Sequence, residues 1–446
     1  MMNRYMYFFR LPMQLTSVFR IAGRDDENEV LRDGDGRYVL PGTSIAGAVK
    51  SFWQTEFPGV CSRLLGDEEN DSSTFFYDAV CENVRYEKRV GVKIDGRYGV
   101  VKAGQLYKQY FIGQGMTCSL LLQFSVSESD LDIALKMVRS LVAAINVGRV
   151  RFGAKKVNGA GVFEVHNATY RLLNLHEAAN RREYLETDIL EQFNRCTTAL
   201  GSEKSFGKAA EAEWMSYRMT VSIPNALLVR SGEKESGTGS AALNMSKTFD
   251  GEDRYFIPAT TIKGLIRAQA LRIAQVFGIG EETIQKIFGH DSESDSEPLA
   301  GAVFAEDCLI DKAKETVYHR LMIDRLTGAG VNGALVNEKV LSTGTDSNTV
   351  IRVSIDRERL NSRECGDRLW KLANAFVFLT LRDIGAGRLA IGSGESIGYG
   401  YVEASVLALN DLECRFDVKA QTIDAGDSEP MIREWLSELE VTDEKN

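Results

Sequence analysis

Apolar and polar positions follow the same order of periods in both halves of the chain. Each half opens with an apolar run, RYMYFFRLPM or YRMTVSIPNALLV, that predicts a strand. After a polar loop, apolar residues recur at helical spacing from residue 45 and again from residue 262. Two further strand runs, a second helical pattern (residues 130–147 and 368–384) and a last strand complete each half. This order is the βαββαβ order of a ferredoxin-like module, so the pattern predicts an α+β fold with two tandem ferredoxin-like (RRM-like) modules, inserted hairpins and a helical connector.

Three short motifs recur in the same order in the two halves. The prolines of the first motif are 217 positions apart, the second motif repeats at a constant offset of 229, and the glycines of the third at 239. Such an ordered series indicates a tandem duplication. The motif pairs are LPGTSIAGAVK (40–50) with IPATTIKGLIR (257–267), IDGRYGVVKAGQLY (94–107) with IDRLTGAGVNGALV (323–336), and RFGAKKVNGAGVFEV (151–165) with AIGSGESIGYGYVEA (390–404).

The repeat and the composition between its copies predict the domain boundaries. We expect a first module at residues 1–165 and a second at 215–410. Residues 166–214 are polar with a helical pattern, which predicts a connector between the modules. Residues 411–446 are predicted to form an acidic tail, in which MIREWLSEL matches a short amphipathic helix.

Composition places the chain among soluble globular proteins. It has 446 residues, 44% of them apolar, which is enough for sizeable cores. No apolar run approaches the roughly 20 residues that span a bilayer, and Arg4, Arg10 and Pro12 interrupt the N-terminal run where a signal peptide is apolar. We therefore expect a cytoplasmic protein with no membrane contact. The seven scattered cysteines, without a C-x-x-C pair, and the four histidines argue against a disulfide framework and a zinc site.

Net charge by itself argues against a nucleic-acid partner. The formal charge is −10, whereas phosphate binding usually leaves a basic footprint. Many of the acidic residues lie in segments that look peripheral, at residues 66–75, at residues 289–298 and in the tail. The overall charge therefore says little about the surface around any one site.

The proline motifs are candidate phosphate sites. Each places hydroxyl groups and free backbone amides at a predicted helix N-terminus, where anions bind, and adds basic residues on one face of the helix. The alternative is ordinary helix capping above a solvated basic face. The candidate residues are Thr43, Ser44, Lys50, Thr260, Thr261, Lys263 and Arg267.

The glycine-rich motifs and the hairpins carry further candidates. Glycines allow the backbone to approach a ligand and to adopt positive φ, although an ordinary turn is the alternative. In the second glycine motif Glu395 replaces Lys156, so a phosphate there would depend on backbone amides and Ser393. The first hairpin is rich in lysine, arginine and tyrosine, which suits RNA stacking as well as a solvent-exposed hairpin. The candidates are Arg151, Lys155, Lys156 and Ser393 in the glycine motifs and Lys93, Arg97, Lys102 and Arg325 in the hairpins.

Taken together, the ordered motifs PGTSIAGAVK, ID…TG…GAL and GSGESIGYGYV resemble the RAMP superfamily of CRISPR-associated proteins. The chain looks most like the backbone subunits of type III effector complexes, which polymerise along a guide RNA, and the resemblance covers most of residues 1–405. It implies a fused double subunit whose hairpins fold over the guide and displace nucleotides at regular intervals. The implied partners are guide RNA, complementary target RNA and other CRISPR effector subunits.

The resemblance also implies a possible reaction. Backbone subunits of this family often cut target RNA with an aspartate between the first strand and the first helix. A divalent ion such as Mg²⁺ would assist attack by a ribose 2′-hydroxyl. In the first module Asp26, with Asp25 beside it, lies near that position, so both are catalytic candidates and Asp26 is the metal candidate. A polar loop without a catalytic role is the alternative. The second module has Asn244 there, a weak neutral ligand, and is expected to be inactive unless Asp250 substitutes.

The leading hypothesis is thus a guide-RNA-binding backbone subunit that cleaves target RNA as a metal-dependent endoribonuclease if its first acidic loop is active. A non-catalytic capping subunit of the same kind of complex is the first alternative. An unrelated tandem ferredoxin-like protein that binds a small ligand is the second. No histidine lies near the first helix of either module, which argues against guide maturation.

Overall fold

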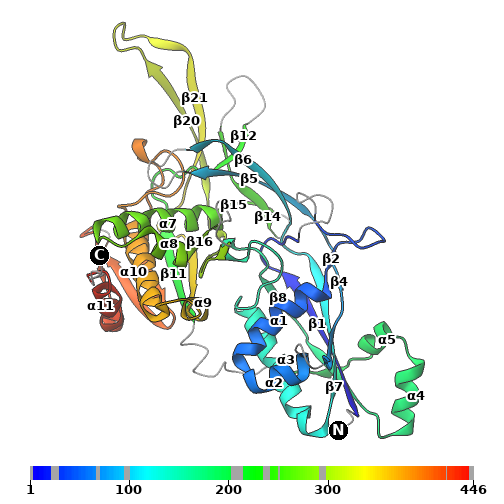
Figure 1. Cartoon of the computed structure of the whole chain (residues 1–446). Coiled ribbons are helices and arrows are strands. Elements are labelled where there is room, and N and C mark those ends of the chain that lie inside the picture. Colours follow the sequence, from blue (N-terminus) through cyan, green and yellow to red (C-terminus); the bar gives the residue numbers. More distant parts are fainter. Residues whose placement is uncertain are drawn as a thin grey trace. The chain divides into compact units, whose positions relative to one another are not determined.

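The computed structural model describes nine stretches of the chain (Figure 1). Contacts divide the chain into two compact units. Unit 1 consists of residues 1–88, 109–156 and 160–209, and unit 2 of residues 89–108, 157–159 and 210–446. The hairpin motif of the first half and three residues of its glycine motif, at 89–108 and 157–159, are therefore grouped with unit 2. The described residues are 4–21, 30–66, 71–94, 101–201, 214–234, 242–249, 252–290, 298–417 and 419–440.

Unit 1 is built on one antiparallel sheet. Strand β7 pairs along almost the whole of β1, from Tyr5 opposite Val126 to Gln14 opposite Thr117, and β3 continues the sheet beyond β7. The short β8 pairs with the end of β1, so the four strands of the module lie in the order β3-β7-β1-β8. The elements are β1 (Tyr5–Leu15), β2 (Val39–Leu40), α1 (Gly42–Glu56), α2 (Pro58–Leu65), β3 (Thr74–Phe76), β4 (Ala79–Val80), β7 (Thr117–Val126), α3 (Leu131–Asn146), β8 (Phe163–Val165), β9 (Thr169–Asn174), α4 (Ala178–Glu186), α5 (Ile189–Asn194) and β10 (Thr198–Ala199).

Both faces of β1 are buried, which explains why its sequence is almost continuously apolar. On one face, Phe9 packs in the main core with residues of α1 and α3 such as Trp53. On the other face, Phe8 meets Phe193 of α5 at 5.5 Å between ring centroids. Strand β9 also pairs with β1, and β10 pairs with β9. Residues 168–200 of the predicted connector thus form part of the unit 1 sheet and cover its second face.

Unit 2 repeats the arrangement around β11, with the strand order β18-β22-β11-β23-β24-β25. Its first four strands match β3-β7-β1-β8 of unit 1. The tail residues in β24 and β25 extend this sheet. The elements are β11 (Trp214–Ser222), β12 (Arg230–Lys234), β13 (Ala242–Asn244), β14 (Ser246–Phe249), β15 (Glu252–Ile257), α7 (Ala259–Val276), α8 (Glu281–Phe288), β16 (Gly289–His290), β17 (Leu299–Ala300), β18 (Val303–Ala305), β19 (Cys308–Leu309), β20 (Lys314–Ile323), β21 (Gly330–Ser342), β22 (Thr349–Asp356), α9 (Arg357–Asn361), α10 (Gly366–Gly385), β23 (Glu403–Leu409), β24 (Leu412–Asp417), β25 (Thr422–Asp424) and α11 (Glu429–Ser437).

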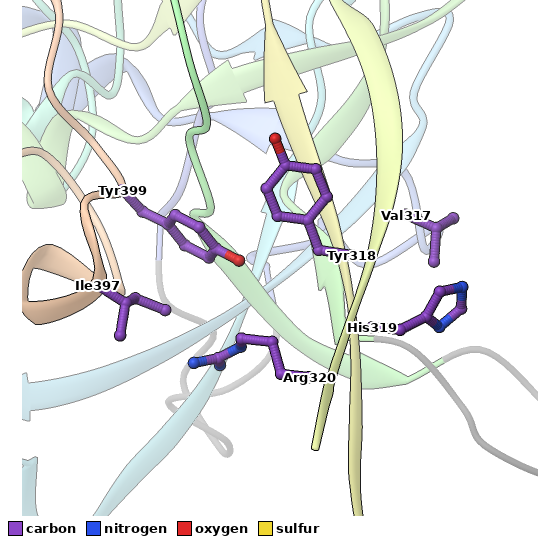
Figure 2. A pocket seen from close by; sticks show the side chains of 6 residues that line it. All are labelled: Val317, Tyr318, His319, Arg320, Ile397 and Tyr399. Atoms are coloured by element: carbon purple, nitrogen blue, oxygen red, sulfur yellow. The ribbon is translucent and has the colours of Figure 1, made fainter. Parts of the chain in front are cut away.

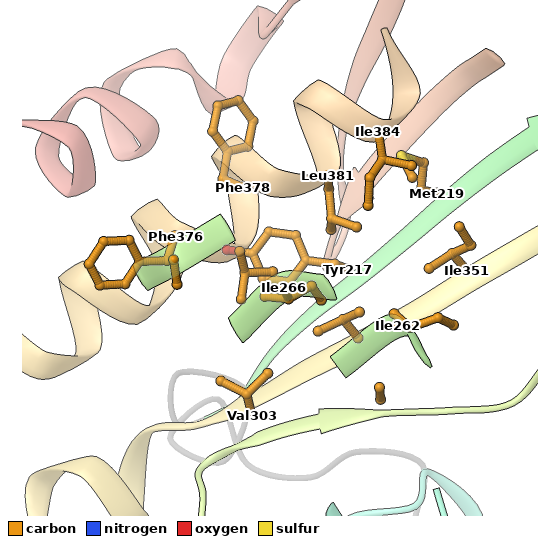
Figure 3. Close-up of a cluster of buried hydrophobic side chains, with 14 of the residues drawn as sticks. Tyr217, Met219, Ile262, Ile266, Val303, Ile351, Phe376, Phe378, Leu381 and Ile384 are labelled. Carbon is orange, nitrogen blue, oxygen red and sulfur yellow. The ribbon is translucent and has the colours of Figure 1, made fainter. Parts of the chain in front are cut away.

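The core of unit 2 lies between its sheet and the helices α7 and α10 (Figure 3). Tyr217 and Met219 of β11 pack there with Ile266 of α7 and Phe376 of α10. In β11, unlike β1, buried residues alternate with less buried ones. Because both units share the ferredoxin-like order of strands and helices, the predicted α+β fold with two tandem modules is confirmed.

Two long hairpins leave the sheets between the second and third strands of each module. The first is β5 (Tyr86–Ile94) with β6 (Val101–Ile112), and the second is β20 with β21. Lys314 opposes Ser342 at the base of the second hairpin and Ile323 opposes Gly330 near its tip. No helix in the described residues is long and apolar enough to cross a membrane.

Candidate nucleic-acid interface

The two proline motifs begin helices with the same backbone geometry. Pro41 precedes α1 with φ −61° and ψ 140°, and Pro258 precedes α7 with φ −62° and ψ 143°. Thr43 and Thr260, in the first turn, are both exposed. The next residue is half-buried in both helices, Ser44 in α1 and Thr261 in α7. The N-cap proline of each helix makes no side-chain cap bond, and no hydrogen bond within the described residues uses these hydroxyls, so they remain available to a ligand.

A carboxylate that the sequence analysis missed binds the first amide of each helix. Gly42 N lies 2.7 Å from Asp78 Oδ1, and Ala259 N lies 2.9 Å from Asp307 Oδ1. The two aspartates are 229 positions apart, the offset of the hairpin motif, and that offset is the signal that could have found them. Each carboxylate offsets part of the positive end of its helix. A phosphate is therefore left with the following amides and the hydroxyls of Thr43 or Thr260.

Asp307 differs from Asp78 in its cationic partners. Arg89 contacts both Asp307 oxygens, at 3.1 Å and 2.6 Å, and Lys247 Nζ lies 3.3 Å from Asp307 Oδ2. Burial by itself raises the pKa of Asp307, but the two cations outweigh it and lower that pKa to about 2. Among the described residues, Asp78 has no ion pair. Among the described residues, cations therefore hold the capping carboxylate in the second module and not in the first.

The basic residues of these helices are engaged with the protein. Lys50 Nζ donates to Gly66 O, at the end of α2, over 3.0 Å. Lys263 is only 9% exposed, and burial together with the charges of Arg267 and Arg359 lowers its pKa to about 7. Arg267 is half-buried. Phosphate contact by Lys50, Lys263 and Arg267 remains a prediction, and the exposed threonines are the better-placed contacts.

The glycine-rich turns are held by the same backbone bonds in both units. Ala154 N donates to Arg20 O over 2.7 Å, and Ser393 N donates to Leu228 O over 2.8 Å. Ala154 and Ser393 are 239 positions apart, the offset of this motif. Gly161 has φ +79°, and a Cβ added there would lie 1.9 Å from a backbone oxygen. Glycine is needed here because of close packing within the turn.

Within the first turn, the predicted cations have different roles. Arg151 is buried, and it donates to Gly148 O over 2.8 Å and to Lys156 O over 3.1 Å. It therefore shapes the turn. Lys155 is exposed with φ 59°, and Lys156 is half-buried. In the second turn Ser393 is half-buried. Lys155 is the residue of this group that is most accessible to a ligand.

Of the four hairpin candidates, Arg325 is the one whose side chain the structure describes. Arg325 is exposed near the tip of the second hairpin. Arg97 lies outside the described residues, as do the side chains of Lys93 and Lys102. The second hairpin instead exposes large apolar side chains, which usually mark an interaction surface when they are contiguous. These are Val317, Tyr318, Leu321, Met322, Ile323, Leu326, Leu335 and Val336.

A family model for the RAMP superfamily matches residues 16–164 and 224–403, which together are more than half of the chain. The chain belongs to the RAMP superfamily. Each matched region contains one copy of the helix start, the hairpin and the glycine turn, so the predicted family is confirmed. Among solved structures, this RAMP protein is similar to a chain of the type III-B Cmr-beta complex bound to cognate target RNA. That similarity has 13% identity and a TM-score of 0.30, and it covers 37% of this chain and 60% of that chain. No curated protein matches the sequence.

At the base of its hairpin, the second RAMP module has an open pocket of about 440 Å³ (Figure 2). The rings of Tyr318 and Tyr399 lie 6.0 Å apart, and Arg320 stands 5.9 Å from the Tyr399 ring. Arg320 is also paired with the buried Glu338 at 2.7 Å. The hairpin and the glycine turn therefore meet in an aromatic surface. Its lining residues are Val317, Tyr318, His319, Arg320, Ile397 and Tyr399.

The catalytic candidates of the first RAMP module, Asp25 and Asp26, lie outside the described residues. Within the described residues, no group of three or more histidine, cysteine or acidic side chains could hold a metal ion. In the second module Asn244 is buried, and it accepts from Val229 N and donates to Lys339 O. Both ends of this amide are thus used by the backbone, which gives Asn244 a structural role.

Proposed function

We propose that this RAMP protein is a guide-RNA-binding backbone subunit of a type III CRISPR effector complex. The observation that carries the proposal is the duplicated frame, in which both modules have the same proline-started helix, glycine turn and hairpin. Each copy presents an exposed threonine at a helix start, where backbone amides favour an RNA phosphate. Two copies in one chain would give two guide-binding positions.

A comparison between the copies supports assembly with another RAMP module. Within unit 2, a Cβ added at Gly159 would lie 2.9 Å from Ala259 Cβ, and Arg89 contacts Asp307. The equivalent of Gly159 in the second module is Gly398, which has nothing within 4 Å of an added Cβ. The equivalent of Arg89 is Tyr318, which is 40% exposed.

Gly398 and Tyr318 thus lie open where their equivalents Gly159 and Arg89 have close neighbours within unit 2. A surface of exposed aromatic and aliphatic side chains is typical of a contact with a protein partner and not of a face that stays in water. We propose that a further module of the effector complex packs on this surface, at the base of the β20–β21 hairpin. Such stacking would continue the guide track from one subunit to the next.

Guide binding is tested at the two helix starts. We expect the double variant Thr43→Ala, Thr260→Ala to bind guide RNA more weakly, by about tenfold for each hydrogen bond lost to a charged phosphate. Filter binding at fixed salt measures the affinity, because phosphate contacts are salt-dependent. Thr197→Ala, at another exposed threonine, is the matched control. Equal affinity of the double variant and the control would remove these helix starts from the guide track.

Target cleavage is a separate part of the proposal. We propose that Asp26, with Asp25, would hold a divalent ion such as Mg²⁺, which supplies charge stabilisation at the scissile phosphate. The engaged amide of Asn244 favours a second module that only binds, so one active loop per chain is expected. The double variant Asp25→Ala, Asp26→Ala is assayed for target cleavage in the assembled complex. Unchanged cleavage with intact guide binding would assign the chain a non-catalytic, capping role.

A further inference from the structure

A second pocket of unit 2 gathers three of the four tryptophans of the chain. Trp214 of β11, Trp370 of α10 and Trp435 of α11 line a cavity of about 310 Å³. Trp370 and Trp435 are 7% and 3% exposed, and Trp214 is half-buried at the edge. This pocket shares no lining residue with the one at the hairpin base. Its size is within the range of small-ligand sites.

The charged side chains around this pocket already neutralise one another. Arg357 Nη2 lies 3.0 Å from Asp367, and Lys371 Nζ lies 3.3 Å from Asp367 and 3.2 Å from Glu434. Arg357 also stands 5.3 Å from the centroid of the Trp370 ring. Two cations thus face two anions in one connected network. An ionic ligand would find no unmatched charge, so the pocket favours a neutral group.

The hydrogen-bond partners of the indole N–H groups are the next feature of this pocket. In unit 1, Trp53 Nε1 donates to Met137 O over 2.9 Å. The indole N–H groups of Trp214, Trp370 and Trp435 make no hydrogen bond within the part of the chain that the structure describes, and none of the three is sealed from solvent. Buried tryptophans usually find a hydrogen-bond acceptor. The pocket therefore combines indole rings with N–H donors that an oxygen or nitrogen acceptor can reach.

We infer that the pocket formed by Trp214, Trp370 and Trp435 binds a single nucleobase. A nucleobase is flat enough to stack on indole, and its ring nitrogens and carbonyl oxygens accept hydrogen bonds. Its heterocycle is neutral, as the balanced charges require. The phenyl ring of a partner protein has the flat face without the acceptors, and a phosphate has the acceptors without the face. The inference stands on this pocket alone and does not depend on guide binding at the helix starts.

Tryptophan fluorescence of the full-length chain tests this inference, because three of its four tryptophans line the pocket. The probes are AMP, GMP, CMP and UMP, with ribose 5-phosphate as the control that lacks a base. We expect saturable quenching by one or more of the four nucleotides and none by ribose 5-phosphate. A single-stranded hexanucleotide of the preferred base then separates the sources: tighter binding of the hexanucleotide indicates an RNA segment, and equal or weaker binding indicates a free nucleotide.

Two variants at the edge of the pocket complete the test. Trp214→Ala is expected to weaken binding about fivefold or more, since a stacked base contributes about 1 kcal/mol or more. Trp214→Phe keeps an aromatic face and is expected to bind more tightly than Trp214→Ala, and Trp53→Phe is expected to leave the nucleotide affinity unchanged. Circular dichroism confirms that each variant is folded.

Three outcomes would overturn the inference: no quenching by any nucleotide, equal quenching by ribose 5-phosphate, or unchanged affinity in Trp214→Ala. Quenching by a phenylalanine-bearing dipeptide and by no nucleotide would assign the pocket to a partner protein instead. Guide binding is measured on Trp214→Ala in parallel. Loss of nucleotide affinity with unchanged guide affinity shows that the two sites are independent.

Discussion

Replacing Asp307 tests the buried charge network at the start of α7. Asp307→Ala removes the acceptor of Ala259 N and leaves Arg89 and Lys247 as buried cations without their shared carboxylate. Breaking a buried pair in this way typically costs about 3 to 5 kcal/mol. In a unit of this size that corresponds to a loss of roughly 10 °C in melting temperature. Scanning calorimetry on the full chain measures the shift.

The pH dependence of stability gives an independent estimate of the free energy that the ion pairs of Asp307 contribute. The pKa of Asp307 falls from 3.8 to about 2 in the folded chain, which is about 2 kcal/mol of stabilisation. Because the folded pKa is the lower one, this stabilisation is present above pH 4 and is lost as the pH falls towards 2. Asp307→Asn is expected to lack this part of the acid dependence.

Asp78→Ala is the matched control, because Asp78 makes the same capping bond in α1 without an ion pair among the described residues. Loss of a helix cap alone costs about 1 kcal/mol. The difference between the two alanine variants therefore isolates the cations. If Asp307→Ala lowers the melting temperature no more than Asp78→Ala does, the reasoning about Arg89 and Lys247 is refuted.

Three further changes test the packing of the modules. Gly161→Ala is expected to destabilise unit 1 by about 2 kcal/mol or more in urea unfolding, since its Cβ would clash at positive φ, whereas Gly47→Ala, in open space on α1, should gain about 0.5 kcal/mol. Burial lowers the pKa of Lys263 to about 7, so between pH 7 and pH 10 the unfolded chain binds one more proton there than the folded chain, and the unfolding free energy rises with pH. Lys263→Met should remove this rise. An unchanged rise would contradict the burial of this amine. Tyr217→Phe removes the hydroxyl that donates to the buried Asn374 Oδ1 over 2.7 Å. By the same unfolding assay this should cost about 1 to 3 kcal/mol, because a buried acceptor is left unpaired. A neutral result would show that water replaces the hydroxyl.

Local sequence signals were sufficient for the order of strands and helices in each module. Pro41 and Pro258 mark two helix starts because proline sets φ and lacks the amide that a helix start leaves unpaired. The apolar run of β1 indicated a strand, but it gave no sign that α5 covers its second face through Phe193. That face is decided by residues more than 180 positions away in the chain. Such a pairing has no local signature.

The candidate site was predicted in outline and missed in detail. The sequence indicated cations near RNA, yet Arg151 donates to backbone carbonyls and Lys263 is buried, because a long basic side chain also serves to close turns and cover helix ends. The helix-start aspartates Asp78 and Asp307 escaped notice because a single acid in a strand segment is unremarkable until its contact is seen. Only their shared offset of 229 connects them.

By itself, the amino-acid sequence determined that the chain is a duplication of one βαββαβ unit, because periodicity, turn residues and motif order are local properties that repeat along the chain. The resemblance of its motifs indicated the RAMP superfamily, which the family model confirmed. Tertiary structure alone decided which copy of the capping aspartate is locked by Arg89 and Lys247, and which three tryptophans share a pocket. Those outcomes depend on residues that are distant in sequence and adjacent in space, where burial strengthens the attraction between opposite charges.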